Sequence, residues 1–185
     1  MQFKLLALAS SAAAAALSGQ WTGFESLPDG AYSGIVHANG STTVTSVDTG
    51  AEHFFGLESG SAAQKRSISK RDVYCNGNYL NHGDVDATYQ SLQNWAGAGQ
   101  TLSCSSGRTR FHGYVRGGAV SYACCNKGDT SYVFTADFVR YAFGAMDGNR
   151  GERGCPAHMA SFYAEPGSDK LVGKDAAGAS FCAGH

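Results

Sequence analysis

The spacing of apolar residues predicts two helices in the second half of the chain. The first is expected from an N-cap at Asp84 to a stop at Gly97, with an apolar stripe formed by Val85, Thr88, Tyr89, Leu92, Trp95 and Ala96. The second is expected over residues 130–146, capped by Thr130 or Thr135, with a stripe formed by Phe134, Phe138, Tyr141, Ala142 and Ala145.

Other segments have the aromatic and β-branched composition typical of strands. Thr109–Arg116 and Ala119–Cys125 flank Gly117-Gly118, which is a two-residue hairpin signal. Further strands are expected at residues 72–75 and 158–164, with an edge strand over residues 171–182. The order strand, helix, hairpin, helix, strand predicts an α+β fold. We expect a small disulfide-stapled sandwich, with two helices on a mostly antiparallel sheet.

The first residues are mostly small or apolar. The basic residue Lys4 precedes an apolar run from Leu5, and small residues up to Gly19 offer cleavage positions. This pattern predicts a secretory signal peptide over residues 1–19, and therefore a secreted, extracellular protein. A membrane span needs about 20 apolar residues. The run is shorter, and no later segment approaches that length, so no transmembrane segment is expected.

The cysteines are confined to the C-terminal part of the chain. An even number in one segment of an exported protein predicts a disulfide framework. Zinc would favour closely paired ligands such as C-x-x-C, which the sequence lacks, so neither a metal nor a cofactor is expected. On a strand, adjacent cysteines point to opposite faces, so each should bond a different distant partner. The sequence does not choose among the pairings of Cys75, Cys104, Cys124, Cys125, Cys155 and Cys182.

Composition divides the rest of the chain near two basic dipeptides, Lys65-Arg66 and Lys70-Arg71. Residues 20–71 lack cysteine and hold short apolar alternations, too few to close a core alone. We expect this segment to be a propeptide that is cut after Arg71, with a glycosylation sequon at Asn39. Residues 72–185 would then be the mature cysteine-rich domain.

This layout resembles fungal secreted precursors that kexin-type proteases cut at Lys-Arg pairs. The segments Leu27-Pro28-Asp29-Gly30-Ala31-Tyr32 and Asn39-Gly40-Ser41-Thr42-Thr43 also resemble propeptides of such proteins. In its order of elements, the part after Arg71 resembles fungal killer toxins and killer-toxin-like effectors. The resemblance implies a virulence or toxin role by fold-level analogy, because no residue motif carries it.

Charge bears on the class of partner. The net charge of -1 and pI near 6.6 lack the basic excess that is usual in nucleic-acid binders, so no nucleic acid is expected. We expect an extracellular or host-cell target, which the sequence does not identify.

Candidate binding residues are Arg108, Arg110, Arg116, Asn149, Arg150, Arg153, Tyr114 and Tyr122. If the two tyrosines share an outer face of the sheet, that face could bind a carbohydrate or a protein.

Common catalytic motifs such as H-E-x-x-H, G-x-S-x-G and the P-loop are absent from residues 72–185. The sequence therefore favours a non-enzymatic effector or toxin-like protein that acts by binding. A secreted hydrolase, ribonuclease first, is the alternative, with a general acid, a base and a cationic clamp drawn from His112, Arg110, Glu152 and His158. A cell-wall or carbohydrate-binding module is a further alternative.

Overall fold

The computed structural model describes residues 24–56, 73–105, 107–126, 129–148 and 154–182. Two helices, α1 (His82–Ala96) and α2 (Ala136–Met146), follow the short 3-10 helix η1 (Phe24–Ser26) in the chain. The strands are β1 (Gly30–Val36), β2 (Thr42–Ser46), β3 (Glu52–Phe55), β4 (Val73–Tyr79), β5 (Gln100–Ser103), β6 (Thr109–Arg116), β7 (Ala119–Cys125), β8 (Ser131–Phe134), β9 (Met159–Ala164) and β10 (Lys170–Ala176).

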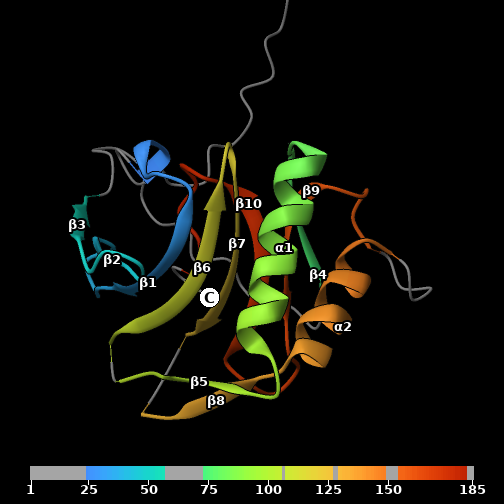
Figure 1. Cartoon of the computed structure of the whole chain (residues 1–185). Coiled ribbons are helices and arrows are strands. Elements are labelled where there is room, and N and C mark those ends of the chain that lie inside the picture. Colours follow the sequence, from blue (N-terminus) through green and yellow to red (C-terminus); the bar gives the residue numbers. More distant parts are fainter. Residues whose placement is uncertain (1–23, 57–72, 106, 127–128, 149–153, 183–185) are drawn as a thin grey trace, which may run out of the picture.

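Eight of these strands form one sheet in the order β3-β2-β1-β6-β7-β10-β9-β4. Every neighbouring pair in it is antiparallel. Both helices lie against the same face, with α1 over β6 and β7 and α2 over β9 and β10 (Figure 1). The expected α+β architecture is confirmed, and the sheet has more strands than the sequence indicated.

Helix α1 begins earlier than expected. Its N-cap is Asn81, whose side-chain oxygen accepts from the backbone N–H of Asp84 at 3.2 Å. The predicted cap at Asp84 is therefore wrong, because this residue already lies in the first turn. The predicted apolar stripe is confirmed in its centre, since Val85, Thr88, Leu92 and Ala96 are buried. The helix ends at Gly97 as expected.

Helix α2 begins later than expected. Thr135 is its N-cap, with a side-chain oxygen that accepts from the N–H of Phe138 at 3.2 Å. Residues 131–134 are extended and form β8, which pairs with β5 in a separate ribbon. The prediction of helix over residues 130–134 is wrong. Phe134 fits a helical spacing to Phe138, but its side chain reaches the same core from a strand.

The predicted hairpin is confirmed, with β6 and β7 paired up to Arg116 and Ala119 around the glycine turn. Strand β10, in contrast, is central and not an edge strand, because β7 pairs on one side of it and β9 on the other. The sheet edges are β3 and β4. The order of strands in the sequence does not show which strands form the edges, because β4 and its neighbour β9 are far apart in the chain.

The first three strands belong to the part of the chain that precedes the basic dipeptides. Strand β1 pairs with β6 from Gly30 opposite Val115 to Val36 opposite Thr109. Strands β2 and β3 extend the sheet outward from β1 (Figure 1). The buried residues of these strands complete a core that they share with the rest of the chain.

Apolar side chains fill both sides of the sheet. The helix side holds Leu92, Phe134, Val139, Phe143, Met146, Tyr163 and Val172. The opposite side holds an aromatic cluster centred on Phe181, with Phe24, Phe55, Phe111 and Tyr122 around it. No described helix is long and apolar enough to cross a membrane.

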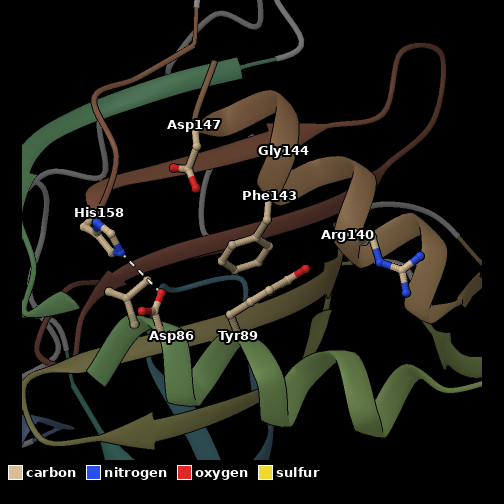
Figure 2. A pocket seen from close by; sticks show the side chains of 8 residues that line it. Asp86, Tyr89, Arg140, Phe143, Gly144, Asp147 and His158 are labelled. Atoms are coloured by element: carbon tan, nitrogen blue, oxygen red, sulfur yellow. Dashed lines mark hydrogen bonds and ion pairs between the residues drawn. The ribbon is translucent and has the colours of Figure 1, made fainter. Parts of the chain in front are cut away.

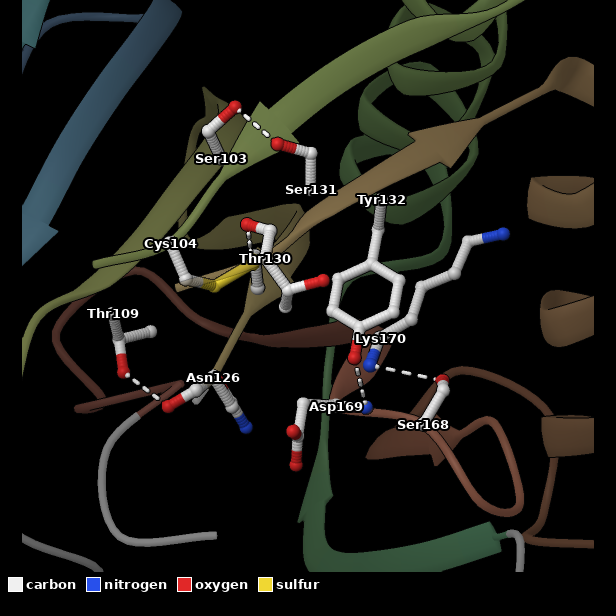
Figure 3. The surroundings of a disulfide bond; sticks show 11 residues. Ser103, Cys104, Thr109, Asn126, Thr130, Ser131, Tyr132, Ser168, Asp169 and Lys170 are labelled. Atoms are coloured by element: carbon white, nitrogen blue, oxygen red, sulfur yellow. Dashed lines mark hydrogen bonds between the residues drawn. A yellow bond between two sulfur atoms is a disulfide. The ribbon is translucent and has the colours of Figure 1, made fainter. Parts of the chain in front are cut away.

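Three disulfides join Cys75 to Cys155, Cys104 to Cys125 and Cys124 to Cys182. The adjacent cysteines of β7 point to opposite faces and have different partners, which confirms that prediction. Figure 3 shows how the bond from Cys104 fixes the β5–β8 ribbon to the end of β7. Nearby, the side chains of Ser103 and Ser131 are hydrogen-bonded across the ribbon at 2.7 Å.

Candidate functional site

A groove of about 240 Å³ lies between the two helices (Figure 2). The rings of Tyr89 and Phe143 pack against each other in its lining, with centroids 4.4 Å apart. Polar groups surround these rings and come from α1, from α2 and from the turn before β9. The lining residues are Val85, Asp86, Tyr89, Arg140, Phe143, Gly144, Asp147 and His158.

His158 is held in place from several directions. Its backbone has a left-handed φ of 59°, which is uncommon for a residue with a side chain. Its carbonyl accepts from the N–H of Leu80 at 3.0 Å, and its ring stacks on His82 at 3.7 Å. Nε2 lies 3.3 Å from a carboxylate oxygen of Asp86. Nδ1 is buried and has no hydrogen-bond partner among the described residues, so this arrangement presents neither ring nitrogen to the groove without the ring moving.

Arg140 is fixed at one end of the groove. Its Nη1 donates to Asp137, three residues earlier on α2, at 2.7 Å. With the amide of Gln93 turned so that its oxygen faces α2, that oxygen accepts from Nη2 at 2.9 Å and from Nε at 3.1 Å. The guanidinium group, whose side chain is 58% exposed, thus links α2 to α1 and places a positive charge beside the aromatic rings.

A buried ion pair fixes the other end. Lys174 on β10 is fully buried, and its Nζ donates to the carboxylate of Asp147, the C-cap residue of α2. A buried ammonium group requires such a partner because its desolvation is costly. The pair therefore holds the end of α2 against the sheet.

Tyr89 supplies a neutral hydroxyl between these two ends. Burial raises the pKa of Tyr89; Arg140 opposes this shift and Asp147 adds to it. The hydroxyl accordingly stays protonated at neutral pH and can donate a hydrogen bond to a ligand. Two carboxylates, one guanidinium group and one hydroxyl thus surround two aromatic rings, an arrangement suited to binding a small polar group.

The proposed hydrolase residues do not converge. His112 is only 4% exposed, its ring stacks on Trp95 at 4.2 Å, and burial lowers its pKa from 6.5 to about 4. His158 lies beside Asp86, and nine residues of helix, about 14 Å, separate Asp86 from Trp95. Arg110 is exposed at one end of β6, while Glu152 lies outside the described residues.

The two candidate tyrosines lie on opposite faces of the sheet, so the condition for a shared binding face is not met. The register pairs Tyr114 with Ser121 and Tyr122 with Gly113, and neighbouring residues on a strand point to opposite sides. Tyr122 is 1% exposed and stacks on Phe181 at 4.3 Å, within the core.

The candidate arginines are also spread out. Arg116 and Tyr114 line a second hollow of about 240 Å³, beside α1 and the start of β1. Arg110 lies six residues from Arg116, or about 20 Å along the strand, and Arg108 lies beyond it, exposed. Residues 149–153, which include Asn149, Arg150 and Arg153, lie outside the described residues, as do both basic dipeptides.

Asn39 of the sequon is exposed in the turn between β1 and β2, where its side-chain oxygen accepts from the N–H and hydroxyl of Ser41.

Among the residues that the structure describes, no group of three or more His, Cys, Asp or Glu side chains could hold a metal ion.

From the sequence, Tyr89 was expected only in the apolar stripe of the first helix, and Asp86, Arg140 and Asp147 were not predicted as site residues. A signal was present, because Asp86 and Tyr89 are three residues apart and Arg140, Phe143 and Asp147 follow a spacing of three and four. Such residues share one helix face.

Comparison with protein-family models, known proteins and solved structures finds no match for this chain. A function can therefore be inferred only from the geometry of the groove.

Proposed function

We propose that this chain is a secreted effector or killer-toxin-like protein that acts by binding a target outside the producing cell, through the groove between α1 and α2. The observation that carries the proposal is the fixed set of charges around the rings of Tyr89 and Phe143. The three disulfides and the absence of a membrane-spanning helix among the described residues are compatible with an extracellular protein.

Preorganisation supports a binding role. A site whose side chains are already held pays little conformational entropy when a ligand arrives. Arg140 is held by Asp137 and Gln93, and Asp147 is held by Lys174. The turn that carries His158 begins beside Cys155, whose disulfide to Cys75 anchors it to β4.

The size of the groove bears on the ligand. A volume of about 240 Å³ lies just below the range of about 300–1,000 Å³ that is usual for small-molecule sites. It suits one side chain or one sugar ring of a larger target. Arg140 would pair with an acidic or hydroxyl-rich group, and the rings would pack against its apolar face.

Hydrolysis is the less favoured function. General base catalysis needs a nitrogen or oxygen within hydrogen-bond reach of the substrate. Nε2 of His158 faces Asp86 and its Nδ1 is buried, while His112 lies beneath Trp95. Proton transfer through either ring would require it to leave the position that it occupies.

The test is to apply the purified, oxidised secreted protein to fungal cells and to plant tissue, with the reduced protein as a control. We expect growth inhibition or a tissue response that disappears on reduction. Arg140→Ala should weaken the response at least tenfold. Arg108→Ala, which removes an exposed arginine far from the groove, should leave it within about twofold.

Two results would count against the proposal. No response to the oxidised protein in either system would remove the effector and toxin functions, and nuclease and glycan-binding screens would then come next. A response lost in Arg108→Ala but kept in Arg140→Ala would place the binding surface outside the groove.

A further inference from the structure

The N-terminal strands have no covalent link to the rest of the fold apart from the chain itself. All three disulfides join residues from Cys75 to Cys182, and residues 24–56 contain no cysteine. Cleavage after Arg71, which the sequence predicts, would therefore leave residues 24–56 attached only by non-covalent contacts.

The backbone contact is extensive. All seven residues of β1, from Gly30 to Val36, are in register with β6. Beyond the strands, the carboxylate of Asp29 accepts from the N–H of Gly117 at 2.8 Å, in the turn of the β6–β7 hairpin. Without β1, the edge of β6 would expose a row of unpaired N–H and C=O groups.

The side chains interlock with the aromatic cluster. The N-terminal segment supplies six of the sixteen buried residues in this cluster. Phe24 packs edge-on against Phe55 at 5.3 Å and against Phe181 at 5.6 Å. Phe181 in turn lies edge-on to Phe111 at 5.0 Å. Loss of the segment would therefore uncover large aromatic side chains that are otherwise almost fully buried.

The fit between the two parts is close. The ring of Phe111 lies so near Gly34 that a Cβ on this glycine would stand 2.3 Å from it. On the other face of β1, the hydroxyl of Ser33 lies 3.1 Å from Nδ1 of His112. Contacts on both faces and along the backbone are typical of neighbouring strands within a domain core.

The connection to be cut joins opposite edges of the sheet. Strand β3 forms one edge and β4 the other, so seven spacings of about 4.8 Å separate them, or on the order of 34 Å along the sheet. Residues 57–72 join the two edges and can reach roughly 50 Å when extended. A cut after Arg71 precedes the first residue of β4, Val73, and breaks none of the strand pairs.

We propose that residues 24–56 stay bound after cleavage at the Lys-Arg pair, as the smaller subunit of a non-covalent two-chain protein. The docking surface is the edge of β6 together with the cluster around Phe181. The second hollow, which Asp29 and Gly30 line together with Tyr114 and Arg116, is then complete only in the two-chain form.

The test uses the chain from residue 20 with a site-specific protease sequence in place of residues 65–71, so that cleavage is complete and verifiable by mass. After the cut, we expect both fragments to co-elute in native size-exclusion chromatography and to separate in denaturant. A large fragment that elutes without its partner at micromolar concentration overturns the proposal, whatever its own folding state.

Two neighbouring phenylalanines of β3 give a matched pair of variants. Phe55 is 7% exposed and packs on Phe24, whereas Phe54 is 69% exposed. Phe55→Ala should raise the dissociation constant of the cut protein about a hundredfold or more, and Phe54→Ala should change it within about twofold. Equal effects of the two substitutions would overturn the role of the buried cluster. Because no toxicity or target binding is measured, this test can fail or succeed independently of the proposed function.

Discussion

Protonation of His112 should destabilise this protein in mild acid. The imidazole lies on β6 beneath α1, where it stacks on Trp95 and is hydrogen-bonded at Nδ1 by Ser33. Its Nε2 is buried without a hydrogen-bond partner among the described residues. A charged ring would lose its hydration there, and desolvation accordingly lowers the pKa of His112 from 6.5 to about 4.

The magnitude follows from proton linkage. Between pH 6.5 and 4 the unfolded chain binds a proton at His112 that the folded protein does not bind, so the free energy of unfolding falls as the pH falls. The difference between the two pKa values, 6.5 minus 4, corresponds to about 3 kcal/mol at roughly 1.36 kcal/mol for a tenfold change in proton affinity. The contribution is fully present above pH 6.5 and is lost by about pH 4.

The assay is urea unfolding of the oxidised, uncut protein at several pH values from 7.5 to 4, followed by tryptophan fluorescence. His112→Phe preserves the stacking on Trp95 and removes the titration, so the pH dependence of the wild type should exceed that of the variant by about 3 kcal/mol. His82→Gln, at an exposed histidine, should retain the wild-type dependence. If His112→Phe and the wild type lose stability equally on acidification, the reasoning is refuted.

Two further substitutions test the groove and α2 through equilibrium unfolding. Asp147→Ala leaves the ammonium group of Lys174 buried and unpaired, and should cost near the lower end of about 3–5 kcal/mol because Asp147 is partly exposed. Stability in the double variant Asp147→Ala/Lys174→Met should recover, and failure to recover would mean that the carboxylate acts otherwise. Thr135→Ala removes the N-cap of α2 and should cost about 1 kcal/mol, whereas Thr130→Ala should cost less; the reverse order would contradict the observed start of the helix.

Local patterns predicted the elements whose determinants lie close together in the chain. Gly117 adopts a φ of 52° in the hairpin turn that the sequence indicated, because glycine adopts such angles without strain. The stripe that includes Val85 and Leu92 predicted which face of α1 is buried. The adjacency of Cys124 and Cys125 predicted different partners, although the partners themselves required the fold.

What the sequence could not show depends on contacts between distant segments. Phe134 has the same spacing to Phe138 whether it belongs to a helix or precedes one, and only pairing with β5 decides that it is extended. The alternation around Tyr32 was too short to close a core alone, and it did not show that this segment would pair with β6 as a strand. The groove was equally hidden, because Asp86, Arg140 and His158 come from three segments that meet only after folding.

The pairing of β1 with β6 also sets an order of events. Gly30 and Val115 are partners in the sheet but far apart in the sequence, and in the uncut chain the intervening residues keep β1 at a high effective concentration near β6. Refolding of the uncut chain should therefore proceed at a rate independent of protein concentration. Once the connection is cut, the same pairing becomes a bimolecular step, and its rate should rise with concentration. If the chain is cut after Arg71, folding before cleavage is therefore the faster route, and the cut protein, once unfolded in dilution, should return to its native state far more slowly than the precursor.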